Sequence, residues 1–150
     1  MRAPLLVLLW VLLAFEALGG LLIFLMRLAD GRTPGEWLHV AVGAVFTLAY
    51  VGYQIPHLVR VSPWRSRLDY ALGLIAALAM LVTLTTGLWL AAQWWPVRIT
   101  AGSPAPIAYA PTLSAVHNIM SMLVLTFVGA HLAAVLMRDA RSPVRDRARR

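Results

Sequence analysis

Four long apolar segments alternate with short polar ones along the chain. The apolar segments run from Leu5 to Leu28, Glu36 to Arg60, Tyr70 to Trp95 and Thr112 to Met137. Each can cross a bilayer as an α-helix, which needs about 20 mainly apolar residues. The first exceeds the apolar core of a signal peptide, about 7–15 residues, so we expect it to be retained. The pattern predicts an all-α fold, an integral membrane four-helix bundle.

Composition agrees with a membrane protein. The chain is 61% hydrophobic and only 13% charged, which is more apolar surface than a soluble domain of 150 residues can bury. The net charge of +7 comes from arginines that cluster between the apolar segments and at the C-terminus, so we expect no nucleic-acid partner. The absence of Cys excludes disulfides, thiolate iron–sulfur ligation and covalent c-type haem attachment.

The distribution of arginine predicts the orientation of the chain. Ten of the 13 arginines lie in the N-terminus, residues 60–67 and the tail. Arg27, Arg32 and Arg98 lie in the other two connections, of which Pro96 to Pro111 is expected to be the longest loop of the chain. The positive-inside rule therefore places both termini of this multi-pass protein in the cytoplasm. Residues 1–137 form the transmembrane domain, and residues 138–150 form a basic cytoplasmic tail. We expect this tail to be disordered and to lie at the lipid headgroups.

All four histidines lie in the second and fourth spans. His39 and His57 are 18 residues apart, about 27 Å along a helix, and His117 and His131 are 14 apart, about 21 Å. Both separations are near whole numbers of turns, so each pair shares a stripe. Because the two spans are parallel, His39 and His117 should lie near the outer face and His57 and His131 near the inner face.

Two imidazoles at each level suit an iron with two axial ligands. We expect two haem b groups, an outer one held by His39 and His117 and an inner one held by His57 and His131. Zinc or copper would need three or four ligands at one point. Alternatively, the histidines only bond between helices or line a proton path. The distance between His39 and His57 exceeds that between His117 and His131 by about 6 Å, a difference that helix tilt or a kink at Pro56 could remove. Tyr53 could compete with His57 for the inner site.

Other residues follow the same two levels. Gly73 and Gly87 in the third span are 14 residues apart and either permit close helix packing or leave room for the faces of two macrocycles. Arginines at both faces could pair with haem propionates, as Arg27, Arg32 and Arg98 would at the outer face.

Glu16 is either a proton or quinone contact or a protonated acid bonded to a neighbouring helix. The polar candidates for a quinone site are Glu16, Gln54 and Asn118.

At His117 and His131 the chain resembles the four-helix membrane cytochrome b families. These are the bacterial cytochrome b561 type and the cytochrome b subunits of nickel–iron hydrogenase and formate dehydrogenase, whose fourth helix carries two haem-ligating histidines at this spacing. In those families the first helix usually supplies one ligand to the inner haem. This first span has no histidine, so either the inner partner is His57 or the inner haem is altered or absent.

The resemblance implies a di-haem b-type cytochrome that is the membrane subunit of a respiratory oxidoreductase. Such a subunit transfers electrons across the membrane between a soluble or peripheral partner subunit and the quinone pool, in contact with membrane lipid. It carries electrons and needs no catalytic residue of its own. Two alternatives stay open: a stand-alone cytochrome b561-like quinone or superoxide oxidoreductase, and a haem-free membrane anchor subunit.

Overall fold

The computed structural model describes residues 3–60, 67–102 and 107–148. It contains α1 (Ala3–Asp30), α2 (Glu36–Arg60), α3 (Arg67–Trp95), the short π-helix η1 (Pro96–Thr100) and α4 (Pro111–Ala148). The described part has no strand. The four α-helices are each long and apolar enough to cross a membrane. The prediction of an all-α, four-helix membrane fold is therefore confirmed.

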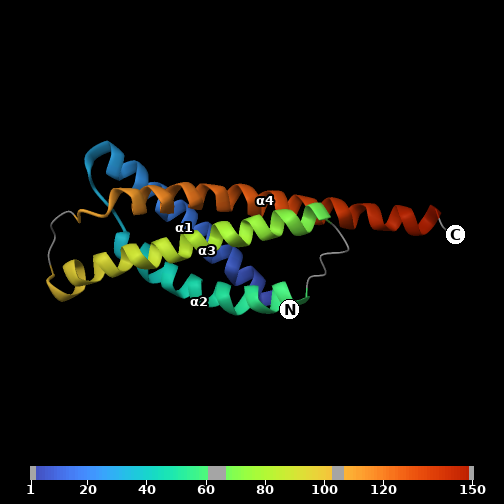
Figure 1. Ribbon diagram of the computed structural model, residues 1–150, viewed down its shortest axis with the longest axis horizontal. Helices are drawn as coiled ribbons and strands as arrows, with labels where there is room; N and C mark the ends of the chain where they lie inside the picture. Colours follow the sequence, from blue (N-terminus) through green and yellow to red (C-terminus); the bar gives the residue numbers. More distant parts are fainter. Residues whose placement is uncertain (1–2, 61–66, 103–106, 149–150) are drawn as a thin grey trace.

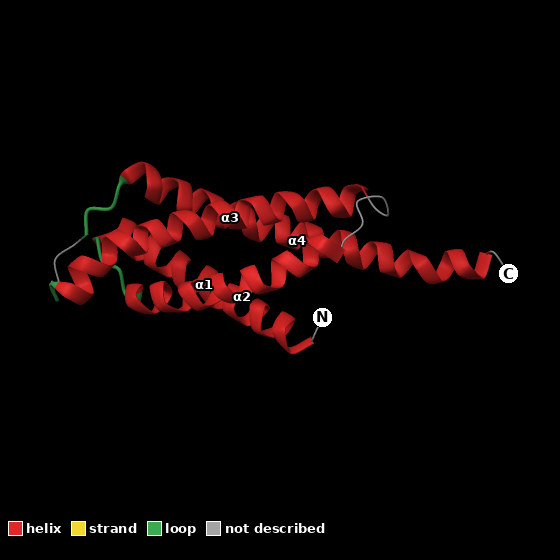
Figure 2. Ribbon diagram, turned by 60° about the horizontal axis from the view of Figure 1, so that its bottom comes forward, coloured by secondary structure: helices red, strands yellow, loops and turns green. Residues whose placement is uncertain are grey.

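The helices run up and down, so α2 and α4 are parallel and α1 and α3 run the other way (Figure 1). We call the end that holds both termini the termini end and the opposite end the distal end. Helix α3 packs along α4, α1 packs against α2, and α2 also meets α3 (Figure 2). Helix α4 continues beyond the other helices at the termini end. The bundle thus consists of two helix pairs, α1–α2 and α3–α4.

A small apolar core at mid-bundle joins all four helices. Leu9 comes from α1, Phe46 from α2, Ala79 and Met80 from α3, and Val124 from α4, and all five are buried. Val124 lies seven residues from each of the two histidines of α4. The core therefore separates the two histidine levels with packed hydrocarbon.

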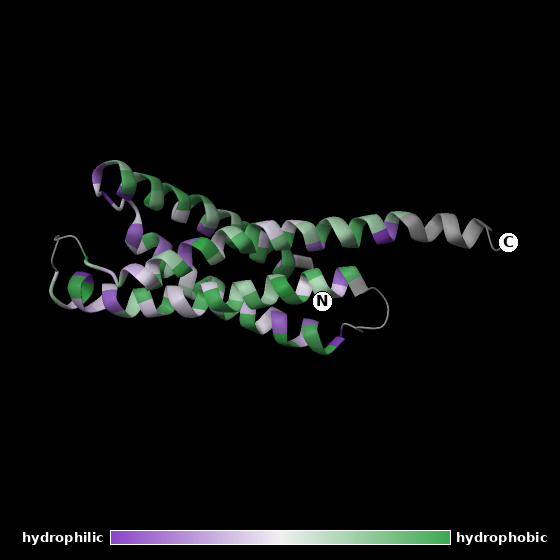
Figure 3. Cartoon of the chain, turned by 45° about the horizontal axis from the view of Figure 1, so that its top comes forward, coloured by the Kyte–Doolittle hydropathy of each residue, from purple (hydrophilic) through white to green (hydrophobic). Residues whose placement is uncertain are grey.

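The outer surface of the bundle is apolar rather than polar. Large side chains such as Val59 (83% exposed) and Leu48 (77% exposed) face outward. Hydrophobic residues cover the helices through most of their length, and hydrophilic ones gather toward the ends (Figure 3). A helical bundle that exposes so much apolar surface requires lipid as its solvent, which fits contact with a membrane.

A tight turn at the distal end fixes where α2 begins. Gly31 (φ 77°) ends α1 by donating its N–H to the carbonyl of Arg27 at 3.1 Å. Gly35 (φ 72°) accepts hydrogen bonds from the N–H groups of Leu38 and His39 at 2.9 and 3.0 Å. Both glycines adopt the left-handed conformation, which other residues rarely take. This turn places His39 in the first turn of α2.

Two expectations were wrong, one about the connection between the third and fourth spans and one about the C-terminal tail. Residues 96–111 do not form a loop throughout, because η1 continues directly from α3. Pro96 has no N–H to donate, and its carbonyl instead accepts a wider bond from Ala101 N–H at 2.9 Å. The tail is also not disordered as far as Ala148, since α4 continues to that residue; extending an existing helix avoids the cost of a new nucleus. Arg2, Arg65 and the last two arginines lie outside the described residues.

Candidate functional site

The structure brings His39 and His117 together between the two helix pairs. Their ring centres are 6.4 Å apart and their planes are inclined by 77°. With metal–imidazole bonds of about 2 Å, two rings on opposite sides of one metal have centres about 6 Å apart. Within the described residues the backbones of α2 and α4 do not pack closely along each other. This distal pair therefore has the spacing of two axial ligands.

The backbone of α3 orients the His117 ring. Nδ1 of His117 lies 3.0 Å from the carbonyl oxygen of Thr83 and 3.3 Å from the hydroxyl of Thr86. A carbonyl oxygen can only accept, so Nδ1 donates and carries the proton. The lone pair is then on Nε2, the arrangement of a metal-binding histidine whose other nitrogen is held by the protein.

His131 is held in the same way at the termini end. Its Nδ1 lies 3.0 Å from the backbone oxygen of Asp69 and 3.2 Å from the Asp69 carboxylate. The other carboxylate oxygen of Asp69 accepts a hydrogen bond from Arg138. Asp69 is buried, at 7% exposure, so its charge is balanced locally by Arg138. Again Nδ1 is the donor and Nε2 keeps the lone pair.

Asp69 was not identified from the sequence, because the third span was expected to begin one residue later, at Tyr70. In the structure α3 begins three residues before Tyr70, at Arg67, so Asp69 lies in the first turn of that helix. Acidic residues are favoured there because they complement the helix dipole. That preference was the one available signal for its position, and nothing in the sequence indicated its contact with His131.

His39 differs from the two histidines of α4 because its partner is a carboxylate. Nδ1 of His39 lies 2.8 Å from Oε2 of Glu16, and both side chains are largely buried. The contact is close but not aligned as a hydrogen bond, which leaves Nδ1 and the second Glu16 oxygen without a hydrogen-bond partner in the part of the chain described. Glu16 therefore lies beside a histidine of the neighbouring helix, and the pair is an interhelical polar contact.

Glycines make room for this pair at the α1–α2 interface. A Cβ atom on Gly20 would lie 3.2 Å from Cε1 of His39, and one on Gly43 would lie 3.3 Å from Oε2 of Glu16. Both distances are tighter than ordinary contacts between carbon and its neighbours. The small residues of α1 and α2 thus permit a buried carboxylate and a buried imidazole to meet.

Gly73 and Gly87 do the same for the histidines of α4. A Cβ atom at Gly73 would lie 2.9 Å from Cε1 and Nδ1 of His131, and one at Gly87 would lie 2.9 Å from Cε1 of His117. Each glycine is therefore at the level of one histidine. Each glycine therefore permits a histidine ring of α4 to lie close to the backbone of α3.

His57 lies at the level of His131 but not in a ring contact with it. The His57 ring stacks on Tyr53 with centres 5.3 Å apart and an angle of 16° between the planes. His57 is close enough to His131 and Asp69 to interact with both electrostatically. We call His57 and His131 the proximal pair. Tyr53 supports His57 by stacking on it.

The remaining polar candidates are less well placed. Gln54 and Asn118 are both half-buried. Neither makes a hydrogen bond with a histidine among the described residues. Their role at a quinone site therefore stays a prediction.

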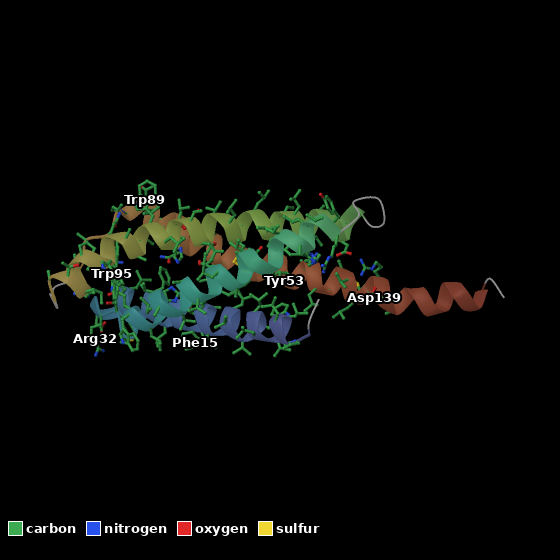
Figure 4. All side chains as sticks on the ribbon, turned by 90° about the horizontal axis from the view of Figure 1, so that it is seen from below. Phe15, Arg32, Tyr53, Trp89, Trp95 and Asp139 are labelled. Carbon is green, nitrogen blue, oxygen red and sulfur yellow. The ribbon has the colours of Figure 1, made fainter. Side chains whose placement is uncertain are left out.

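Three arginines gather at the distal end, where Arg32 is seen opposite the end that carries Asp139 (Figure 4). They line a pocket of about 440 Å³ together with Glu36 and Tyr109. The Tyr109 hydroxyl donates to Glu36 at 2.6 Å, and Arg98 lies 3.6 Å from the same carboxylate. Burial and this bond to a carboxylate raise the pKa of Tyr109 above its usual value, so the phenol stays protonated and donates.

These features define an all-α, multi-pass membrane protein, with His39 and His117 in ring contact at the distal end and with His57 and His131 within electrostatic range of each other at the termini end. None of the protein-family models, curated proteins and solved structures compared with this chain matches it. Its function therefore has to be argued from the geometry of the histidines.

Proposed function

We propose that the chain is a di-haem b-type cytochrome, the membrane subunit of a respiratory oxidoreductase related to the four-helix membrane cytochrome b families. It would transfer electrons across a prokaryotic cytoplasmic membrane, between a soluble or peripheral partner subunit and the quinone pool. The observation that carries the proposal is the distal pair, in which the rings of His39 and His117 lie with their centres 6.4 Å apart. Both termini would lie in the cytoplasm.

The donor set fits haem iron. His117 and His131 each direct Nδ1 to a backbone oxygen, at 3.0 Å, which leaves Nε2 as a ligand atom. His39 and His57 come from the other helix pair, so each site would join α2 to α4. When bound, haem would supply reversible one-electron chemistry, and it would be held by His39 and His117 at the distal level and by His57 and His131 at the proximal level.

The residues around each level would control the sites in different ways. At the distal level, Glu16 places a carboxylate beside His39, and at the proximal level Asp69 and Arg138 hold His131. The mid-bundle core excludes water between the two levels. Side chains that hold a ligand and exclude water are the means by which a protein adjusts the potential of a haem.

A second candidate function is supported by the same contacts. Glu16–His39 and Asp69–His131 each join two helices, and polar pairs of this kind stabilise membrane bundles without any cofactor. A haem-free anchor subunit is therefore the alternative. A stand-alone quinone or superoxide oxidoreductase would use the same two haem sites as the first proposal.

The decisive experiment is the absorption spectrum of the purified protein, reduced with dithionite minus oxidised, with haem counted per chain. Two b-type haems per chain are expected. One haem would keep the distal site and remove the proximal one from the proposal. A colourless protein that is folded, helical by circular dichroism and produced with ample haem would refute the cytochrome and favour the anchor.

A further inference from the structure

The pocket at the distal end lies where a membrane surface would be. It is built by the end of α1, the 31–35 turn, the first residue of α2, η1 and residues 107–109. Three of the candidate membrane spans end or begin here, at Asp30, Glu36 and Thr100. A pocket at the ends of spans is at the depth of lipid headgroups rather than of acyl chains.

The charges around the pocket leave one positive charge unbalanced. Arg27, Arg32 and Arg98 line it, and the acidic groups are Glu36 in the lining and Asp30 paired with Arg32. Three positive and two negative charges sum to +1. A phosphodiester carries one negative charge, so it would neutralise this group, whereas inorganic phosphate at neutral pH carries more.

Each guanidinium is already held in place. Arg32 binds Asp30 at 2.6 Å, and Arg98 lies 3.6 Å from Glu36. The guanidinium carbon of Arg27 lies over the Tyr109 ring, 5.2 Å from its centre, which is a cation–π contact. Arginines oriented before binding lose less side-chain freedom when an anion arrives.

Part of the lining is apolar. Met26, Pro34 and Ile107 contribute to the pocket, and the lipid-facing surface of the bundle adjoins it. A free anion gains nothing from such a surface, whereas the glycerol and first methylene groups of a lipid do. We propose that this pocket binds the phosphodiester of an anionic phospholipid headgroup in the leaflet at the distal end, through Arg27, Arg32 and Arg98.

The pocket is separate from the distal histidine pair. Neither His39 nor His117 lines it. Gly20 of α1 lies against His39, and Arg27 is seven residues farther along that helix, about 10 Å. The lipid site therefore does not depend on the proposed function, and its test can be read whether or not haem is bound.

The test compares lipids on delipidated full-length protein in detergent. Thermal unfolding is followed by circular dichroism with added phosphatidylglycerol, phosphatidylcholine or inorganic phosphate. Phosphatidylglycerol should raise the Tm of the wild type more than the other two. Arg27→Gln should weaken the apparent affinity for phosphatidylglycerol at least about tenfold, since it removes a charge-assisted contact. Arg60→Gln, an exposed arginine at the other end of α2, should bind as the wild type does.

Three results would overturn the proposal. An equal effect of inorganic phosphate would make the pocket a site for free anions. An unchanged response of Arg27→Gln to phosphatidylglycerol would show that the arginine does not bind the headgroup. Haem is counted in the same samples, and a loss of haem from Arg27→Gln that is absent from Arg60→Gln would assign the pocket to a haem propionate instead.

Discussion

Replacing Gly87 with Ala is the most direct test of how the histidines are packed. The added Cβ atom would lie 2.9 Å from Cε1 and 3.4 Å from Nδ1 of His117. Carbon atoms in contact prefer about 3.5–4.0 Å, so the ring must withdraw by roughly 0.6 Å or more. It cannot withdraw without lengthening its 3.0 Å bond to the carbonyl of Thr83.

The magnitude follows from these two costs. Overpacking of a well-filled site costs about 1–3 kcal/mol, and a weakened hydrogen bond adds up to about 1 kcal/mol. Alanine regains up to about 1 kcal/mol because it is a better helix former than glycine. The net expectation is a destabilisation of about 1–3 kcal/mol in the protein without haem. In the loaded protein, displacement of His117 should lower occupancy of the distal site.

The assay measures Tm by circular dichroism and haem per chain on the same samples. Gly129→Ala is the matched control, because it lies on the same helix as His117 and a Cβ there meets nothing within 4 Å. It should be neutral or slightly stabilising. If Gly87→Ala keeps the Tm, haem content and spectrum of the control, the ring does not depend on the glycine. Gly73→Ala should act likewise on His131, through a Cβ 2.9 Å from its ring.

Three further predictions concern the polar contacts. His117→Ala should remove the distal haem and His131→Ala the proximal one, and unchanged haem content in both variants would contradict the assignment. Glu16→Gln should raise the midpoint potential of the distal haem in a redox titration, because it removes a carboxylate 2.8 Å from His39; an unchanged potential would mean that the acid has no electrostatic effect there. Tyr109→Phe should lower the Tm by the loss of one hydrogen bond to a carboxylate. Since folding raises the pKa of Tyr109, the wild-type advantage should be full below the unfolded pKa of about 10 and fall as pH rises toward the folded value; an advantage that grows with alkaline pH would contradict this.

The helices themselves could be predicted closely from the sequence. The second span was expected at Glu36 to Arg60, and these are the bounds of α2. Hydropathy is sufficient here, because a membrane helix has to satisfy all its backbone groups within one apolar segment. The weaker predictions concern polar residues at helix ends. The π-helix after Trp95 and the helical tail depend on hydrogen bonding of backbone that hydropathy does not describe.

The groups that hydrogen-bond to the histidines could not be predicted from the sequence. Helical periodicity can place His117 at a level and on a stripe, but the contact with the Thr83 carbonyl depends on how α3 is rotated about its axis. The same holds for Asp69, whose backbone oxygen meets His131 from 62 residues away. Every residue has a backbone carbonyl, so the amino-acid sequence does not show which carbonyl accepts a hydrogen bond. These contacts can be identified only from the relative positions of the helices.

The groups that contact the histidines differ between the two helix pairs. His117 and His131 are fixed by the backbone of α3, against which α4 packs, so the α3–α4 pair holds both rings in set tautomers. His39 and His57 are carried by the α1–α2 pair, where their neighbours are side chains, a carboxylate and a stacked tyrosine. Side chains can shift more readily than a helix backbone. At either level, a haem would therefore bind one histidine whose orientation is already set and one whose side chain can adjust. Because these two histidines belong to different helix pairs, haem binding would stabilise the contact between the pairs on both sides of the apolar core.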